Sequence, residues 1–214
     1  YDTHRDLHSF PTRRSSDLSD AAPNPPDPIR NEAELDEFLT RPGARLAETI
    51  RTVPSPLLVL GAGGKMGPTL ALLAHRAAEA AGHSLEVIAV SRFTDPRARQ
   101  WLEERGVRTI TADLLDRSAV ARLPDAARVV YLVGRKFGTQ GNPSLSWALN
   151  TLVPANIAER YAGAHIVALS TGNVYPFVPV ASDGATEETP LTPLGEYANA
   201  AVARERVFEH FSHQ

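Results

Sequence analysis

The 214-residue sequence contains no cysteine and has no long apolar run. Without cysteine there are no disulfides, no thiolate metal sites and no cysteine nucleophiles, which fits a reducing compartment, so we expect a cytoplasmic protein. No apolar stretch approaches the roughly 20 residues that a membrane-spanning helix needs. The formal net charge is only −3 and no basic run stands out. We therefore expect neither a membrane nor a nucleic acid among the partners.

Paired metal ligands are also lacking. His75, His83, His165 and His210 are scattered along the chain without the short spacing of a zinc site. Isolated histidines of this kind are more often ordinary surface or core residues than ligands, and we expect no metal.

The first 55 residues differ from the rest of the chain. Residues 6–18 can be back-translated into a common sequencing adapter, so we interpret residues 1–18 as an artefact, the alternative being a natural disordered tail. Residues 19–55 are interpreted as a proline-rich linker and an N-terminal helical extension, with helices expected at 31–38 and 44–51. Residues 56–214 remain for the main domain, which we expect to be incomplete at its C-terminus.

Strand and helix patterns alternate along this main domain. Apolar runs predict strands, and amphipathic patterns predict helices between them. This alternation is typical of an α/β fold, a doubly wound parallel sheet of the Rossmann type. The expected strands are 56–60, 85–90, 107–111, 128–133 and 165–169, and the expected helices are 68–81, 96–105, 117–123, 145–161 and 196–211.

The first strand runs into a glycine-rich turn that precedes a helix. Gly61 permits a tight turn, Gly64 allows the backbone to approach a diphosphate, and Gly67 allows close packing of the helix. The start of the helix offers unpaired N–H groups and the positive end of its dipole to phosphates. We therefore predict a dinucleotide site, the alternative being an ordinary strand-to-helix turn. The candidate cofactor-binding residues in this turn are Gly61, Gly63, Gly64, Lys65, Met66 and Gly67.

Two further strand ends supply candidate cofactor contacts. Ser91 and Arg92 follow the second strand, where an NAD site would place a carboxylate on the ribose. A guanidinium suits a 2′-phosphate, so the prediction is NADP or NAD with NADP favoured, unless Arg92 is a solvated arginine paired with Asp95. Asp113 and its neighbour Leu114 follow the third strand. Asp113 is expected either to accept a hydrogen bond from adenine or to cap the next helix.

A second constellation combines a hydroxyl with a tyrosine. The segment 170–175 follows the fifth strand, and Tyr197 opens the last helix. A hydroxyl at a strand end and a tyrosine on the following helix can converge on one substrate oxygen, with the tyrosine as general acid or base. A tyrosine is a poor base at neutral pH unless a nearby cation lowers its pKa.

These motifs, in this order, resemble the extended short-chain dehydrogenase/reductase superfamily, and within it the NAD-dependent epimerase/dehydratase family. The resemblance spans roughly residues 56–211. It implies that Thr171 and Tyr197 are catalytic, that Tyr197 and Asn150 also lie at the cofactor, and that Asp113 and Leu114 form the adenine side. It also implies a Rossmann sheet followed by a smaller substrate domain, before which this chain is truncated.

One position departs from the family's pattern. Ala201 stands where the Tyr-x-x-x-Lys motif has lysine, the residue that holds the nicotinamide ribose and acidifies the tyrosine. Tyr197 is therefore expected to remain protonated at neutral pH, able to act as an acid but weak as a base. Arg204 is expected to be too far along the helix to replace the lysine directly. Lys136 is an alternative source of positive charge.

Two functions are compatible with these features. The first is an NAD(P)-dependent oxidoreductase or epimerase/dehydratase that transfers hydride on a nucleotide sugar or another hydroxy or carbonyl compound, and a homodimer is possible. The second is a non-catalytic dinucleotide-binding module, a redox sensor or interaction protein that has lost the lysine. A bare fragment that binds cofactor weakly is a third interpretation.

Overall fold

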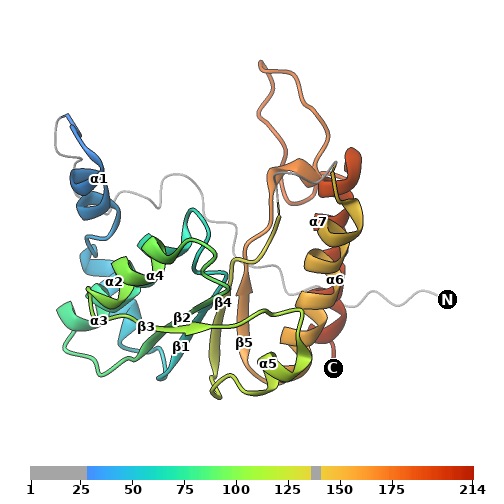
Figure 1. The fold of residues 1–214 in the computed structure, drawn as a ribbon. Coiled ribbons are helices and arrows are strands. Elements are labelled where there is room, and N and C mark those ends of the chain that lie inside the picture. Colours follow the sequence, from blue (N-terminus) through green and yellow to red (C-terminus); the bar gives the residue numbers. More distant parts are fainter. Residues whose placement is uncertain (1–27, 136–140) are drawn as a thin grey trace.

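The computed structural model describes residues 28–135 and 141–214, and its strands alternate with helices (Figure 1). Both the proposed artefact at 1–18 and Lys136 lie outside the described residues. The strands are β1 (Leu57–Leu60), β2 (Val87–Ser91), β3 (Arg108–Thr111), β4 (Arg128–Tyr131) and β5 (His165–Ala168). The helices are α1 (Glu32–Leu39), α2 (Ala44–Ile50), α3 (Gly67–Ala80), α4 (Pro96–Glu103), α5 (Arg117–Ala121), α6 (Pro143–Arg160), the short 3₁₀ helix η2 (Gly172–Val174) and α7 (Gly195–Ser212).

The five strands form one parallel sheet in the order β3-β2-β1-β4-β5. The chain builds outward from β1 to β3 and then crosses back to place β4 on the other side of β1. Leu57 is therefore aligned with Val87 of β2 on one side and with Arg128 of β4 on the other. This order confirms the predicted doubly wound α/β fold of the Rossmann type, and it puts the reversal of strand order between β1 and β4.

The sheet separates two hydrophobic cores. Leu57 and Val59 of β1 face a core shared with α3, whereas Leu58 and Leu60 face a core shared with α5 and α6. Figure 1 shows α2, α3 and α4 grouped on one side and α5, α6 and α7 on the other. All four residues of β1 are buried because both faces are covered, which explains its uninterrupted apolar sequence.

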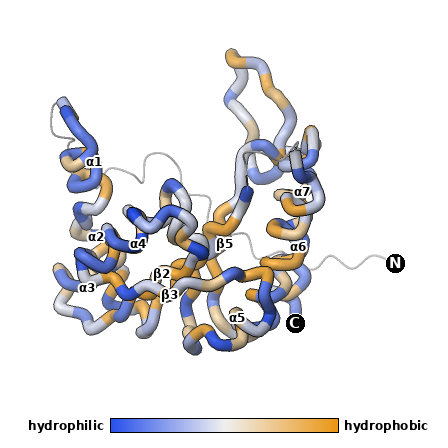
Figure 2. The backbone as a smooth tube through the Cα atoms, in the orientation of Figure 1, coloured by the Kyte–Doolittle hydropathy of each residue, from blue (hydrophilic) through white to orange (hydrophobic). Residues whose placement is uncertain are grey.

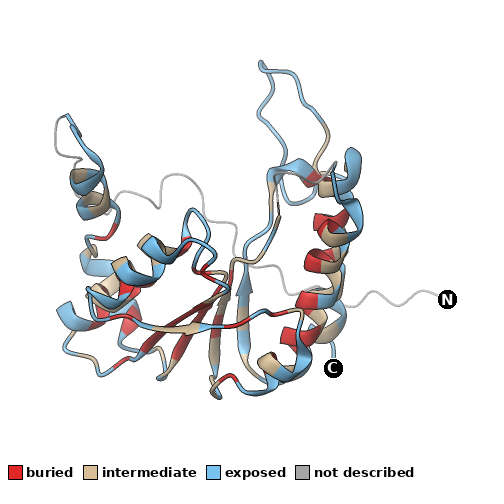
Figure 3. Ribbon diagram, viewed as in Figure 1, coloured by how far each residue is buried: buried red, intermediate tan, exposed pale blue. Residues whose placement is uncertain are grey.

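Burial decreases from the centre of the sheet to its edges. β1 and β2 are almost wholly buried and strongly apolar, as Figures 2 and 3 show, whereas β5 is mainly exposed. His165 and Val167 of β5 face solvent in the described part of the chain. Thr171, the catalytic candidate closest to β5 in the sequence, thus follows the least covered strand.

The N-terminal helices α1 and α2 both contact α3. Arg76 of α3 donates to Glu37 and to Thr40 at 2.7 Å each, and Thr40 is completely buried. Asn31 caps α1 by accepting from the Glu34 backbone N–H at 2.9 Å, as the sequence pattern predicts. The helical extension therefore packs on the main domain at α3.

Some element ends differ from the expected ones. β2 begins at Val87 rather than at residue 85, and β4 ends at Tyr131 rather than at residue 133. Leu132 still donates to the Leu60 carbonyl at 2.9 Å, but the chain then leaves the sheet and turns away. α6 continues through Pro154 to Arg160, as expected for this segment. No helix in the described ranges is long and apolar enough to cross a membrane.

We expect Gly67→Ala to destabilise the fold by about 1–3 kcal/mol, because added atoms in a packed site force the backbone to move. A Cβ atom at Gly67 would lie 2.4 Å from the Ala62 carbonyl oxygen. Urea denaturation checks this, with Gly172→Ala as the matched control since a Cβ there meets nothing within 4 Å. The control should change the unfolding free energy by less than about 0.5 kcal/mol. Equal effects of the two substitutions would contradict the close packing.

Candidate functional site

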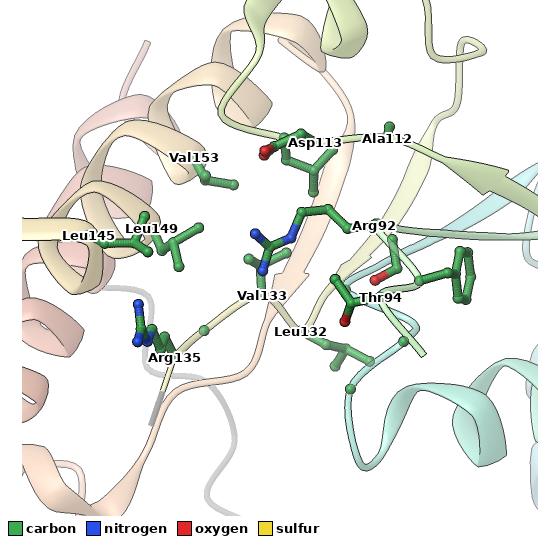
Figure 4. A pocket seen from close by; sticks show the side chains of 17 residues that line it. Arg92, Thr94, Ala112, Asp113, Leu132, Val133, Arg135, Leu145, Leu149 and Val153 are labelled. Carbon is green, nitrogen blue, oxygen red and sulfur yellow. The ribbon is translucent and has the colours of Figure 1, made fainter. Parts of the chain in front are cut away.

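A cleft of about 450 Å³ opens at the carboxyl ends of β1, β2, β3 and β4 (Figure 4). This is the edge of the sheet at which doubly wound folds bind ligands, beside the reversal of strand order. Apolar residues of α6 line the cleft together with glycines of the β1 turn and polar residues at the end of β2. The predicted site residues among its lining are Gly61, Gly63, Gly64, Ser91, Arg92, Asp113 and Leu114.

The turn after β1 brings the ends of two strands into backbone contact. Gly61 has φ +84°, a conformation that side-chain-bearing residues rarely adopt. A Cβ atom there would lie 2.9 Å from the Val133 backbone nitrogen, in the segment that follows β4. The Gly61 N–H donates to the Val90 carbonyl at 2.8 Å, which ties the same turn to β2. Gly61 thus allows the ends of β1, β2 and β4 to meet at the cleft.

Gly63 and Gly64 keep the floor of the cleft bare. A Cβ atom at Gly63 would lie 2.7 Å from the Ser91 hydroxyl, so this hydroxyl lies directly against the turn. A Cβ atom at Gly64 would meet only the Gly61 carbonyl oxygen, at 3.3 Å, and Gly64 lines the cleft. Side chains at either position would occupy space that the turn leaves to the cleft or to Ser91.

The start of α3 lies immediately beyond this turn. Gly67 donates to the Gly64 carbonyl at 3.2 Å, and Met66 precedes the helix. α3 is fourteen residues long, so its first turn carries the positive end of a full helix dipole. Lys65 and Met66 are exposed, and neither they nor Gly67 are among the residues that line the cleft.

Arg92 extends into the cleft from the end of β2 (Figure 4). The alternative that Asp95 pairs with it is wrong. Asp95 instead forms an ion pair with Arg97 at 2.7 Å and caps α4, and the hydrogen bonds from the Arg97 side chain lower the pKa of Asp95. In the described chain Arg92 has no ion pair. Phe93, which follows it, is buried and has φ +45°, so the backbone is fixed directly beside Arg92.

Asp113 faces the same cleft from the end of β3, and Figure 4 shows its carboxylate there. Its Oδ1 accepts from the Leu115 N–H at 3.0 Å. The alternative that Asp113 caps the following helix is wrong, because Asp116 caps α5 by accepting from Ser118 at 2.8 Å. Within residues 28–135 and 141–214 no partner is found for the second carboxylate oxygen of Asp113.

The two catalytic candidates lie outside the lining of this cleft. Thr171 precedes η2 and accepts from the Asn173 N–H at 3.3 Å, so its hydroxyl caps a short helix. Tyr197 lies half-buried in the first turn of α7. η2 contacts α7, which places both residues in the same region beyond β5, but no hydrogen bond joins them in the described chain.

The position of the missing lysine is filled by a small buried residue. Ala201 is fully buried on the face of α7 that also carries Ala198 and Arg204. The nearby Asn150 of α6 is also fully buried, and its side chain donates to the Ser146 carbonyl at 2.8 Å. Neither residue lines the cleft.

Arg204 does not line the cleft, but it contacts a segment that does, and these contacts could not be predicted from the sequence. Its Nη1 donates to the Asn150 Oδ1 at 3.1 Å and to the Val133 carbonyl at 3.2 Å, and the residue is only 4% exposed. It makes no hydrogen bond to Tyr197 in the described part of the chain. The sequence signal was an arginine three residues after Ala201, on the same face of an otherwise alanine-rich helix. No group of three or more metal-ligating residues occurs in the described ranges.

The model of the NAD dependent epimerase/dehydratase family matches residues 57–214, which is well over half of the sequence. The chain belongs to this family. The match begins at the first residue of β1, so α1 and α2 precede it. No curated protein sequence compared with the chain matches it significantly.

Solved structures of similar fold include several sugar-nucleotide enzymes. The dTDP-glucose 4,6-dehydratase DesIV from Streptomyces venezuelae, solved with NAD and TYD, is 21% identical with a TM-score of 0.65, and the match covers 74% of this chain and 52% of that one. The UDP-glucose 4-epimerase of Thermus thermophilus, solved with NAD, is 24% identical with a TM-score of 0.63 and coverages of 74% and 51%. The UDP-Glc/GlcNAc 4-epimerase of Campylobacter jejuni is 20% identical with a TM-score of 0.61 and coverages of 75% and 50%.

The similarity of these structures to the chain concerns the fold. The chain spans about half the length of the structures that it matches.

Proposed function

We propose that the protein binds NAD or NADP in the cleft and acts as an epimerase, dehydratase or related oxidoreductase on a nucleotide sugar or a similar hydroxy or carbonyl compound. The observation that carries this proposal is the bare glycine turn, open to a cleft at the reversal of strand order. Membership of the family supports it, and so do NAD-bound structures of similar fold.

The residues present fit a dinucleotide. A diphosphate needs a backbone surface that no side chain covers, and Gly63 and Gly64 provide such a surface beside the N-terminus of α3. The Gly64 N–H itself donates within the turn, to the Gly61 carbonyl at 3.0 Å. Asp113 has a carboxylate oxygen available to accept from the adenine amine. The apolar side chains of Leu145, Leu149 and Val153 on α6 suit the flat faces of the rings.

Arg92 supports a preference for NADP over NAD. A guanidinium forks onto phosphate oxygens with charge assistance, and the acidic neighbour that would neutralise Arg92 is instead bound to Arg97. An NAD site would place a carboxylate at this strand end, and the chain has Ser91 and Arg92 there. We therefore propose that the cleft prefers NADP to NAD.

In a catalytic protein the nicotinamide ring supplies and accepts hydride, and the protein supplies orientation and proton transfer. Tyr197 is the proposed general acid, and Thr171 is proposed to hold the substrate oxygen. Because Ala201 provides no charge, Tyr197 donates a proton more readily than it removes one. A reaction that needs proton donation to a carbonyl oxygen fits this pair best.

The second candidate is a non-catalytic dinucleotide-binding module. The observation in its favour is Ala201, a small, fully buried residue that carries no ammonium group at the position where the family motif has lysine. A redox sensor requires the glycine turn and the cleft but not an acidified tyrosine. Homodimer formation and a cytoplasmic location also stay proposals.

Gly64→Val is expected to abolish NAD(P) binding while the fold remains intact. The backbone at Gly64 does not have a positive φ, and a Cβ there would meet only the Gly61 carbonyl oxygen, at 3.3 Å. We therefore expect a small shift of the turn to accommodate valine, whose side chain then covers the turn. Fluorescence titration with NADH and NADPH measures the loss. Gly43→Val is the matched control, because Gly43 lies outside the cleft and a Cβ there meets nothing within 4 Å. Unchanged affinity of the Gly64 variant would contradict the proposed diphosphate site.

Arg92→Asp is expected to shift preference from NADP toward NAD by on the order of 10–100-fold in the ratio of dissociation constants, since a carboxylate repels the 2′-phosphate and accepts from a ribose hydroxyl. Calorimetric titrations with both dinucleotides give the ratio. Arg45→Asp, the same charge reversal on the exposed surface of α2, serves as control. A ratio that stays constant removes Arg92 from the cofactor site.

Tyr197→Phe separates the two candidate functions. For an enzyme, loss of the hydroxyl should reduce turnover by about 10²-fold or more while cofactor affinity is retained. The measurement is hydride exchange between bound NADPH and a panel of carbonyl compounds and nucleotide sugars. Cofactor binding without turnover in the unmodified protein supports the non-catalytic module instead.

A further inference from the structure

Arg204 is a buried cation without an acidic partner in the described chain. Its side chain is almost completely removed from solvent, and none of the ion pairs in residues 28–135 and 141–214 includes it. The acidic residue next to it on α7, Glu205, instead accepts a hydrogen bond from Ser170. A buried charge is costly unless a second charge or several hydrogen bonds compensate it.

The protein groups around Arg204 compensate its charge only in part. The guanidinium donates to two neutral oxygens, those of Val133 and Asn150. Tyr131 also lies in its electrostatic surroundings, and burial raises the pKa of the Tyr131 hydroxyl, which therefore stays neutral. That hydroxyl itself has no hydrogen-bond partner in the described chain. None of these three neighbours, Val133, Asn150 and Tyr131, therefore carries a negative charge that balances Arg204.

Arg204 lies directly behind one wall of the cleft. The wall consists of Val133 and Gly134, which follow β4 and line the cleft. A Cβ atom at Gly134 would lie 3.0 Å from the Arg204 Nη1, so the glycine allows the guanidinium to approach the wall closely. Side chains on a helix lean toward its N-terminus, so Arg204 leans from α7 toward the level of Ala201. Ala201, at that level of the helix, is small and fully buried.

We infer that Arg204 is a positioning residue for the cleft: it holds the Val133–Gly134 wall against α6 through Asn150, and its charge favours an anionic ligand on the cleft side of that wall. The ligand class is a dinucleotide diphosphate, so this inference rests on the proposed function. Arg204 would supply its positive charge to the diphosphate from behind the wall, whereas the family's lysine acts on the nicotinamide ribose and the tyrosine from the helix position that Ala201 fills here.

Two variants of Arg204 test the inference, with Arg206→Met as the matched control. Arg206 lies two residues further along α7, is exposed and pairs with Glu209. Arg204→Met removes the charge but keeps a long side chain, and Arg204→Lys keeps the charge and a donor. We expect Arg204→Met to weaken NADPH or NADH binding about 10-fold or more, with adenosine affinity changed less than about 2-fold. Arg204→Lys should recover most of the loss, and Arg206→Met should behave as the unmodified protein.

Hydrogen exchange of the backbone amides at 132–135 in the free protein provides the second measurement. Faster exchange in Arg204→Met, but not in Arg206→Met, supports the positioning role even if the unmodified protein binds neither dinucleotide, an outcome that would overturn the proposed function alone. Unchanged exchange in Arg204→Met overturns the inference. Equal loss of adenosine and NADPH affinity also overturns it, because that result indicates a general collapse of the cleft.

Discussion

The architecture of the cleft depends on one backbone contact, between the turn after β1 and the segment after β4. Gly61 lies so close to Leu132 and Val133 that a single Cβ atom would clash with their backbone. Packing around β1 maintains this contact, because β1 is the buried strand on which the two hydrophobic cores meet. A shift of β1 by one residue would exchange the faces of Leu57–Leu60 and move Gly61 away from Val133. The register of β1 in the sheet therefore determines both the packing of the two cores and the contact that shapes the cleft.

Much of the fold could be predicted from the sequence because each pattern has a local cause. The continuous apolar run before Gly61 predicts a strand covered on both faces, and Asn31 with Glu34 predicts the start of a helix. The strand ends were less predictable. Residues 132 and 133 are as apolar as a strand, but β4 ends at Tyr131. After a last hydrogen bond from Leu132 to Leu60, the chain passes over Gly61, which only the neighbouring strand reveals.

The site was predictable where one segment makes it and unpredictable where several segments meet. The glycine turn could be identified because its residues are consecutive. The ion-pair partner of Asp95 could not be identified from the sequence, since Arg92 and Arg97 are both close to it along the chain. In the structure Asp95 caps α4 and pairs with Arg97. The sequence predicts the position of Arg204 along its helix, but the residues that Arg204 contacts lie on α6 and in the segment after β4. No pattern along one helix contains that information.

Ala201 and Arg204 are structurally linked, because the buried arginine makes the lysine of the family motif unfavourable at position 201. A lysine at 201 would share the same helix face with Arg204, one turn away, and two buried cations at that spacing repel each other. Arg204 already donates to Asn150 and Val133, so a second ammonium would lack acceptors among these oxygens. With Arg204 in place, a small neutral residue at 201 is the choice that electrostatics favours. The buried face of α7 therefore still carries a positive charge, one turn further along the helix and behind the wall of the cleft.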